Sequence, residues 1–239
     1  MDKLVSYRLL DGVATIVMDD GRVNALSRQM LASVVDALDR AASDGAVVVL
    51  TGRAGIFSGG FDLEVLKAGG TDAAQMLKEG FELALRLLEH PTPVVIACNG
   101  HAVAMGVFLL LSGDYRIGAD GPFRIVANEV AIGLTMPWAA IEICRQRLTP
   151  SDFNRVVNLA EAYTPSDGVA AGLLDRVVGE ADLLRTATTT ASGMVGLDRR
   201  AHELTKRRTR EAAITAVRRG LDEDRELFRS LGASSRGRS

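Results

Sequence analysis

The sequence predicts an α/β fold in which buried strands alternate with helices. Two short runs, residues 47–50 and 94–98, consist almost entirely of apolar, largely β-branched residues. Such continuous runs are typical of strands that are covered on both faces. Each run ends in a glycine-containing turn, and an amphipathic helical pattern lies between them. Strands and helices that alternate along a chain favour a layered α/β architecture.

The composition is that of an ordinary globular protein. Apolar residues make up 47% and charged residues 24% of the 239 residues, and the formal net charge is −2. The length suits one large α/β domain with an appendage better than two independent domains. The balanced charge argues against nucleic acid as a partner, because neutralising phosphates needs a basic face.

No pattern of an exported, membrane-spanning or metal-binding chain is found in the sequence. Cys98 and Cys144 lie inside apolar stretches and are expected to be buried free thiols, and the N-terminus lacks a signal-peptide pattern, so a cytoplasmic protein is predicted. The most apolar run, residues 102–111, has only about half the length of a membrane span. We expect no metal site, because the histidines are widely separated: His90, His101 and His202.

The N-terminal part predicts a hairpin and a capped helix. Residues 7–10 and 13–18 flank Asp11-Gly12, a dipeptide suited to the positive φ angles of a tight hairpin turn. Ser27 precedes apolar residues at helical spacing, and its hydroxyl is expected to cap the first turn of that helix.

The middle of the chain continues the alternation. A long amphipathic helix is predicted over about residues 73–89, and two prolines within residues 90–93 end it before the second buried strand. Further strands are expected over residues 115–119 and 123–126, and helices near residues 138–147 and 151–160.

After Gly179 the sequence becomes helical, with helices expected over about residues 181–194 and 198–228. We therefore divide the chain into a core, residues 1–179, and a C-terminal helical appendage, residues 180–239. The basic stretch 206–210 of the appendage is interpreted as a solvated helix face.

Two glycine-containing segments, residues 52–63 and 99–108, are the candidate sites. The first has neither a dinucleotide fingerprint nor a phosphate-binding loop. It also lacks the Gly-x-Ser-x-Gly elbow of a nucleophile, so Ser58 is interpreted as a turn serine. The second places free peptide N–H groups at the start of an apolar helix, where an anion is favoured. Two such turns that faced each other would form an oxyanion hole, although glycine turns after strands are also common in packing.

Several motifs at consistent spacing resemble the enoyl-CoA hydratase/isomerase (crotonase) superfamily. They are Val23-Asn-Ala-Leu26, Phe57-Ser-Gly-Gly-Phe-Asp-Leu63, Asn99-Gly-His-Ala102 through Gly106, Gly113-Asp-Tyr-Arg116 and Asn128-Glu-Val-Ala-Ile-Gly133. The resemblance spans nearly the whole chain. It implies a crotonase-type core of repeated ββα units that binds acyl-CoA, and C-terminal helices that serve as oligomer contact and lid. It also implies a homotrimer or a dimer of trimers, and no cofactor besides the coenzyme A of the substrate.

The resemblance further implies roles for individual residues. The amides of Phe61 and Met105 would form the oxyanion hole, and such donors are each worth ~3 to 4 kcal/mol toward an anionic transition state. Glu129, flanked by apolar segments, would be the acid/base, with a pKa raised by low dielectric. Arg22 and Lys206 are candidates to meet the CoA phosphates, and Asp62 is also explained as a helix cap. The full set assigned to substrate or CoA binding is Arg22, Asn24, Ala25, Ser58, Gly60, Asp62, Leu63, Gly106, Phe108 and Lys206.

The pattern at the acidic positions separates the activities of the superfamily. Hydratases use two glutamates, and the first position falls on Phe108, whose ring cannot take a proton. Losing one general acid/base costs roughly 10²- to 10⁴-fold in rate. Pro137 stands near the place where hydratases offer a glycine amide to water, and proline has no N–H. We therefore predict a Δ3,Δ2-enoyl-CoA isomerase. The alternatives are a hydratase of low efficiency, with Asp62 or Glu64 as substitute acid, and a non-catalytic acyl-CoA-binding homologue.

Overall fold

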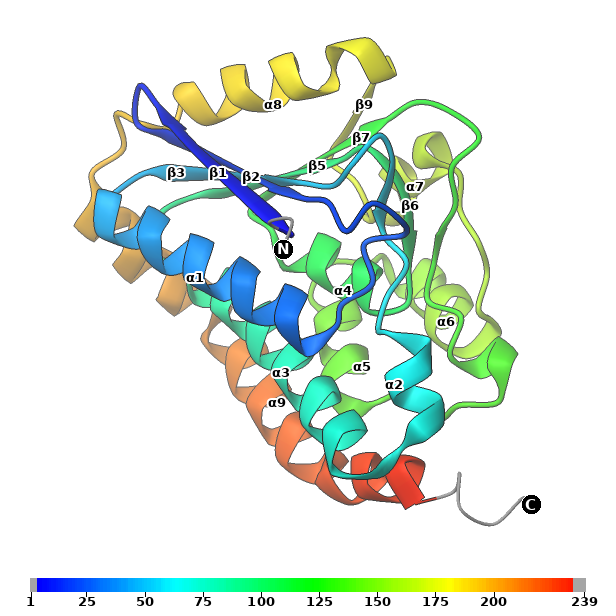
Figure 1. The fold of residues 1–239 in the computed structure, drawn as a ribbon. Coiled ribbons are helices and arrows are strands. Elements are labelled where there is room, and N and C mark those ends of the chain that lie inside the picture. Colours follow the sequence, from blue (N-terminus) through cyan, green and yellow to red (C-terminus); the bar gives the residue numbers. More distant parts are fainter. Residues whose placement is uncertain (1–3, 234–239) are drawn as a thin grey trace.

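Two β-sheets form the framework of the structure, a computed structural model that describes residues 4–233 (Figure 1). The large sheet has the strand order β1-β2-β3-β5-β7-β9, and the small sheet has the order β4-β6-β8. β1 and β2 pair antiparallel, and the other described pairs are parallel. The strands are β1 (Val5–Leu10), β2 (Val13–Met18), β3 (Val47–Thr51), β4 (Gly55–Ser58), β5 (Val94–Cys98), β6 (Gly100–Val103), β7 (Tyr115–Ala119), β8 (Ile125–Val126) and β9 (Arg176–Val178).

Helices cover both faces of the large sheet. They are α1 (Arg28–Asp44), α2 (Leu63–Ala68), α3 (Gly70–Glu89), α4 (Met105–Ser112), α5 (Trp138–Arg145), α6 (Pro150–Leu159), α7 (Pro165–Ala171), α8 (Leu183–Ser192) and α9 (Arg199–Ala233). Short 3-10 turns occupy Val130–Ile132 and Glu180–Asp182. In Figure 1, α8 lies across one face of the sheet, and α1, α3 and α9 lie beyond the other.

The core repeats one unit: a strand of the large sheet, a strand of the small sheet, then a helix. The first unit is β3, β4 and α2, and the second is β5, β6 and α4. The third is β7, β8 and the 3-10 turn that follows. This arrangement is the repeated ββα core that the sequence predicted.

Successive residues of the central strands pack in two different hydrophobic cores, because side chains along a strand point to opposite faces. Val49 and Val95 pack with Leu183 of α8, whereas Val48 and Ile96 belong to the larger core beneath the sheet. The expectation that these strands are covered on both faces is therefore confirmed.

Local signals set the boundaries of the first elements. Asp11 and Gly12 take φ angles of +48° and +77° in the β1–β2 turn. The Ser27 hydroxyl accepts a hydrogen bond from the Met30 amide at 3.2 Å and caps α1. Both local predictions are confirmed.

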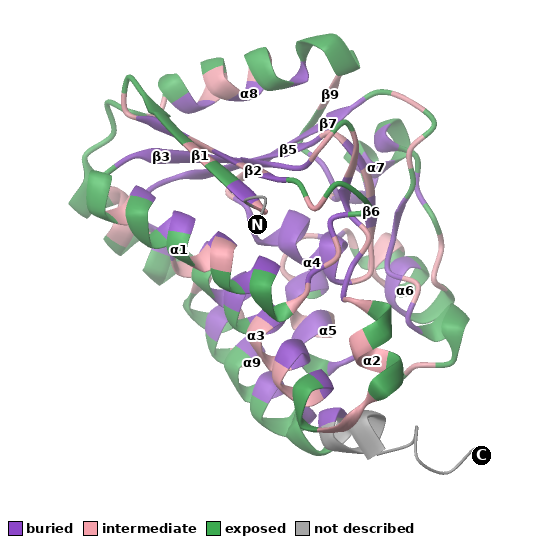
Figure 2. Ribbon diagram, in the orientation of Figure 1, coloured by how far each residue is buried: buried purple, intermediate pink, exposed green. Residues whose placement is uncertain are grey.

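Helix α4 runs through the interior and positions the candidate site. All of its residues, Met105–Ser112, are buried, and Figure 2 shows it within the buried part of the fold. The apolar run that is too short for a membrane span is therefore a core helix. Within residues 4–233, no helix has the length and apolarity that a membrane crossing needs.

Several elements differ from the sequence prediction, and β4 and β6 of the small sheet were not predicted as strands. β8 is shorter than the predicted strand 123–126, since the Arg124 amide donates to His101 Nδ1 instead of to a strand neighbour. α7 and β9 were not predicted, although Thr164 followed by Pro165 is a helix-start signal, and Thr164 does cap α7. β9 has only three residues, too few to show a periodic pattern.

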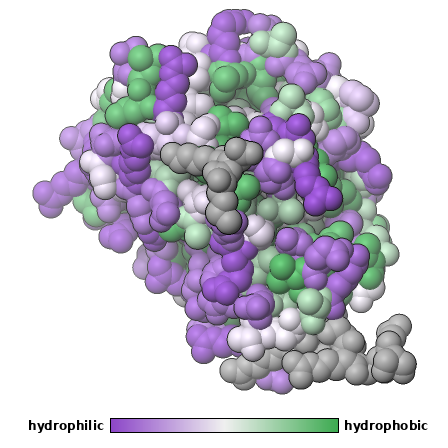
Figure 3. Space-filling view, viewed as in Figure 1, coloured by the Kyte–Doolittle hydropathy of each residue, from purple (hydrophilic) through white to green (hydrophobic). Residues whose placement is uncertain are grey.

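The C-terminal helices pack directly on the core. α8 contacts the large sheet, and α9 runs along α3 and α5. Both predicted helices of this region are confirmed, whereas the functional division at residue 179 stays a prediction. On the molecular face shown in Figure 3, hydrophilic and hydrophobic residues are interspersed.

Candidate active site

Three turns lie at one edge of the small sheet, because its strands are parallel and their carboxyl ends point the same way. The register pairs Ser58 with Ala102 and Val103 with Val126. Two or three residues beyond the strand ends come Phe61, Met105 and Glu129. The fold thus gathers at one edge the three residues that the sequence predicted to act together.

The first two of these turns are in direct contact through Gly60 and Ala104. Their φ angles are +89° and +49°, in a region of backbone conformation that residues other than glycine rarely adopt. A Cβ atom at Gly60 would lie 3.0 Å from the Ala104 Cβ and 3.5 Å from the Met105 nitrogen. Glycine at this position therefore allows the two turns to approach closely.

The amides of Phe61 and Met105 donate to no backbone carbonyl within residues 4–233. The neighbouring peptides carry the bonds instead: the Leu26 amide donates to Gly60 O at 2.8 Å, and the Ala104 amide donates to Val126 O at 2.9 Å. Met105 also begins α4, where first-turn amides have no partner within the helix. Two donors are thus held by their surroundings and left available.

Asp20 organises the loop that borders the first turn. Its carboxylate accepts hydrogen bonds from the amides of Arg22, Asn24 and Ala25 at 2.7 to 2.9 Å. Burial alone would raise the pKa of Asp20, but these amides outweigh it and lower the pKa. The sequence analysis did not single out Asp20, although an aspartate at the start of an irregular Gly-containing loop is a turn signal.

Asn24 ties this loop to β4. The side chain is fully buried and its Nδ2 donates to the carbonyls of Met18, Ile56 and Phe57. Ser58 Oγ donates to Asn24 O at 2.9 Å and accepts from the Gly60 amide at 3.2 Å, as a turn serine does. Both side chains, predicted to bind substrate, are engaged in shaping the turn.

Glu129 is the carboxyl group of the site. It is 8% exposed, and its Oε2 is buried without a hydrogen-bond partner among residues 4–233. Burial raises the pKa of Glu129 to about 7, against a smaller opposing effect of its own backbone amide. Its charge also helps to raise the pKa of the Cys144 thiol on α5, after burial. A carboxyl group in this state can both take up and return a proton near neutral pH.

Phe108 lies in an aromatic cluster rather than beside a second carboxylate. Its ring stacks on Phe81 with centroids 6.0 Å apart. Phe81 also contacts Phe61 edge-on at 6.3 Å and stacks on Phe228 at 6.0 Å. The rings of Phe61 and Phe108 therefore fill the core, while the Phe61 amide faces the edge of the small sheet.

The other predicted residues lie near this edge in different states. Gly106 packs so closely that an added Cβ would be 2.6 Å from Ser58 O. Asp62 caps α2, with Oδ1 accepting from the Glu64 amide at 2.9 Å. Arg22 is exposed in the loop beside Asn24, and Leu63 is exposed at the start of α2.

Lys206 does not lie with the others. It comes from α9 and is 5% exposed, and its Nζ donates to Asp114 Oδ2 at 2.7 Å, just beyond the far end of α4. The structure therefore gives it a buried ion-pair partner instead of a free charge next to Glu129.

Pro137 precedes α5, and the next two amides of that helix already have an acceptor. Trp138 and Ala139 donate to the Asp224 carboxylate of α9 at 2.9 and 3.0 Å. Sequence analysis missed Asp224, because it lies 86 residues from Trp138. Within residues 4–233, no group of three or more His, Cys, Asp or Glu side chains is placed to hold a metal ion.

Repeated ββα units, with two available turn amides and one buried carboxyl group at the edge of the small sheet, define a crotonase-type protein. The model of the enoyl-CoA hydratase/isomerase family matches residues 9–238, and the chain belongs to this family. The family and fold predictions are thus confirmed, and membership of this family supports an enzyme.

Relatives of this chain carry both names of the family. Human mitochondrial enoyl-CoA delta isomerase 1 is 30% identical over 92% of this chain and 74% of its own length. An enoyl-CoA hydratase of Mycobacterium marinum is 44% identical with a TM-score of 0.89, covering 94% of this chain and 98% of its own. A protein of Mycobacterium tuberculosis that is named an enoyl-CoA isomerase in one structure is 44% identical with a TM-score of 0.90, covering 95% of this chain and 99% of its own. A second structure names the same protein a probable enoyl-CoA hydratase.

Proposed function

We propose that this chain is a Δ3,Δ2-enoyl-CoA isomerase in which Glu129 alone moves the proton. The observation that carries the proposal is the state of this carboxyl group: buried, with one oxygen unpartnered and a pKa of about 7. A general base is most effective when its pKa lies near the working pH. The relative at 30% identity that is named an isomerase supports the same activity.

The reaction shifts a double bond along the acyl chain without adding or losing atoms. Glu129 removes a proton from C2 of the 3-enoyl thioester, and the electron pair of that C–H bond passes into a dienolate. The negative charge gathers on the thioester oxygen, and the amides of Phe61 and Met105 donate to it. The protonated Glu129 then returns the proton to C4, which leaves the double bond between C2 and C3.

The two amides supply the largest electrostatic contribution in this mechanism. Backbone donors that are held in place before the reaction stabilise the developing oxyanion without further reorganisation. Their geometry is fixed here by the contact between Gly60 and Ala104 and by the bonds from Leu26 and Ala104. Side-chain identity at Phe61 and Met105 matters little for this role, because the backbone donates.

Hydration requires a second acid/base, and the candidates for it are engaged elsewhere. Phe108 stands in the aromatic cluster, Asp62 caps α2, and Glu64 pairs with Lys67 at 3.1 Å. The amides that follow Pro137 donate to Asp224. These contacts favour isomerisation over efficient hydration.

A non-catalytic acyl-CoA-binding protein is the other alternative. It has no need of a buried carboxyl group, and burying an unpartnered one reduces stability. The retention of Glu129 in this state therefore favours catalysis. By the same family resemblance we expect a homotrimer or dimer of trimers, which analytical ultracentrifugation tests.

Two spectroscopic assays on the purified protein test the proposal, one with a 3-enoyl-CoA and one with a 2-enoyl-CoA. We expect isomerisation of the first, only slow hydration of the second, and a loss of isomerisation of at least about 10³-fold in Glu129→Gln. Rapid hydration that survives Glu129→Gln contradicts the mechanism. Micromolar binding of acyl-CoA without turnover of either substrate establishes the binding protein instead.

A further inference from the structure

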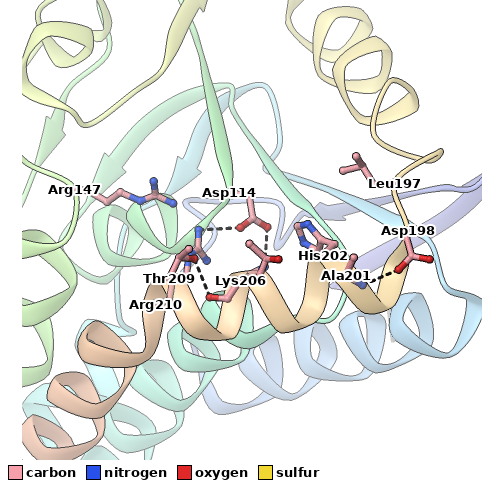
Figure 4. Close-up of a pocket in the computed structure, with 10 residues that line it drawn as sticks. Asp114, Arg147, Leu197, Asp198, Ala201, His202, Lys206, Thr209 and Arg210 are labelled. Carbon is pink, nitrogen blue, oxygen red and sulfur yellow. Dashed lines mark hydrogen bonds and ion pairs between the residues drawn. The ribbon is translucent and has the colours of Figure 1, made fainter.

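A second cluster of charged side chains lies at the opposite end of α4 from Met105. With eight residues at ~1.5 Å each, α4 separates the two sites by ~12 Å. Beyond its C-terminal end, a cavity of about 500 Å³ opens beside the first turns of α9 (Figure 4). The polar groups on which the argument rests are Asp114, Arg147, His202, Lys206, Thr209 and Arg210.

Positive charge exceeds negative charge in this lining. Asp114 binds two of the cations, with Oδ2 2.7 Å from Lys206 Nζ and Oδ1 2.8 Å from Arg210 Nη2. The third cation, Arg147, donates to the carbonyl of Gly113 at 2.6 Å and to no other acceptor among residues 4–233. The other carboxylate of the lining, Asp198, accepts from the Ala201 amide in the first turn of α9. Asp114 thus pairs directly with two of the three cations, and Arg147 forms no direct ion pair with a carboxylate within residues 4–233.

The carbonyl ends of two helices take up part of this charge. Arg210 donates to Leu88 O in the last turn of α3 and, like Arg147, to Gly113 O at the end of α4. Helix C-termini carry only a partial negative charge, so they reduce the excess without cancelling it.

Two nitrogens of the lining residues remain without any partner. Arg147 Nε and His202 Nε2 are both buried and accept or donate no hydrogen bond. Buried polar groups are normally paired, and an exception calls for a ligand or an unseen partner. Here both exceptions belong to residues that line the same cavity, next to the unbalanced cations.

The protonation equilibria agree with this geometry. Burial lowers the pKa of Lys206 to about 8, although Asp114 opposes the effect. Burial and the nearby Arg116 and Arg210 lower the pKa of Arg147 to about 10. The protonated forms of Lys206 and Arg147 are therefore both destabilised in this cavity. An anion placed between them would stabilise both charges.

We propose that this cavity binds a small oxyanion of the phosphate or sulfate class, held by Arg147, Lys206 and Arg210. Two guanidinium groups and an ammonium group provide the planar and point-like donors that tetrahedral oxyanions accept. His202 also lines the cavity, although its Nε2 is buried. The site is separate from the thioester site, and it does not depend on which reaction that site performs.

Thermal unfolding in sodium phosphate, against sodium chloride at matched ionic strength, tests the proposal. A ligand that binds only the folded state raises the unfolding temperature with its concentration. We expect this rise for the wild-type protein and for Arg207→Gln, an exposed cation on the same helix. Arg147→Gln should bind phosphate about tenfold more weakly by calorimetry, because it loses charge-assisted hydrogen bonds.

Thr209→Glu provides an independent variant that does not remove a buried charge. Thr209 is exposed and lines the cavity, so a glutamate there brings a carboxylate to the cations. We expect this variant to unfold at a higher temperature than the wild type in chloride and to lose its response to phosphate.

Three results overturn the proposal. An equal response of the wild type, Arg147→Gln and Thr209→Glu shows that phosphate acts elsewhere. A response that saturating CoA abolishes places the anion in the thioester site. No response of the wild type shows that the cavity is empty or is filled by a carboxylate of a second copy of the chain. The site is established if phosphate raises the unfolding temperature only of proteins that keep Arg147 and Thr209, and if CoA does not change this rise.

Discussion

Glu129 is both buried and the proposed general base, so its titration should control the rate of isomerisation. A general base must be ionised, and with a pKa of about 7 the ionised fraction of Glu129 falls below that pH. We expect kcat/KM for the 3-enoyl substrate to fall about tenfold for each pH unit well below 7. A pH profile measured from 4 to 9 checks this; a limb centred near 4.5 contradicts it.

The same burial means that ionised Glu129 lowers the free energy of unfolding at high pH. The raised pKa means that the folded protein binds a proton that the unfolded chain has lost, between pH 4.5 and about 7. Stability due to this group is therefore highest at low pH and falls as the pH rises through that window. Glu129→Gln should be more stable than the wild type at pH 8, by up to about 3 kcal/mol, and equal to it below pH 4. Urea unfolding at both pH values measures the difference, with exposed Glu64→Gln as control.

Gly60 and Gly55 form a matched pair for testing the contact between the two turns. Both have positive φ, +89° and +78°, but only Gly60 would place a Cβ against Ala104 and near the Met105 amide. Gly55→Ala should cost only backbone strain of about 1 kcal/mol and leave kcat near normal. Gly60→Ala should lower kcat about 10²- to 10³-fold by displacing an oxyanion donor. Equal kcat values in the two variants would contradict the role given to Met105.

At the scale of single residues, the sequence identified the groups that follow a motif and missed those that depend on tertiary contacts. Phe61, Met105 and Glu129 belong to motifs at recognisable spacing. Asp224 lies 86 residues from Trp138, one of the amides that it accepts from, so no local pattern predicts its role. Lys206 looked like a solvated charge in a basic stretch, and only the packing of α9 against Asp114 shows that it is buried.

At the scale of elements, a strong local signal decided what was predictable. The Asp11-Gly12 turn and the Ser27 cap are local, and the fully buried strands β3 and β5 show themselves by composition. The strands of the small sheet have only two to four residues each, too short for a periodic pattern. The sheet that brings the three turns together was therefore implied by family resemblance and not by periodicity.

Asp224 couples two of these elements, because it lies on α9 and caps α5. Its oxygens accept from the Trp138 and Ala139 amides, and the side chain is almost fully buried. Asp224→Ala leaves one buried and one partly buried donor unpartnered, which should lower the free energy of unfolding by about 1 to 3 kcal/mol. Asp222→Ala, two residues earlier on the exposed side of α9, should cost little. Chemical denaturation of both variants checks this. A similar decrease in the free energy of unfolding in both would show that the cap by Asp224 contributes little to stability.

At the scale of the whole molecule, near-neutral composition conceals an uneven distribution of charge. The chain carries a formal net charge of −2. Even so, Arg147, Lys206 and Arg210 gather around Asp114 at one end of α4. Composition shows only that the charges nearly balance, whereas the place where these cations gather comes from the folded chain.

The C-terminal region, which the sequence predicts to be an appendage, packs α9 against α3 and α5. Ile214, Val217 and Leu221 of α9 are buried, and Phe228 stacks on Phe81 of α3. A chain that ends at residue 197 would expose the apolar faces of α3 and α5 that α9 covers. Exposure of that much apolar surface removes a large share of the free energy that stabilises a domain of this size.

We therefore expect the chain ending at residue 197 to lose cooperative thermal unfolding and near-ultraviolet circular dichroism while keeping some helical signal. A synthetic peptide of residues 199–233, added in trans, should restore both signals, because it supplies the contacts that α9 makes with α3 and α5. Cooperative unfolding of the truncated chain without the peptide would show instead that residues 1–197 fold on their own. In that case α9 would be an appendage in the physical sense, and its contacts with α5 and Asp114 would serve the sites rather than the fold.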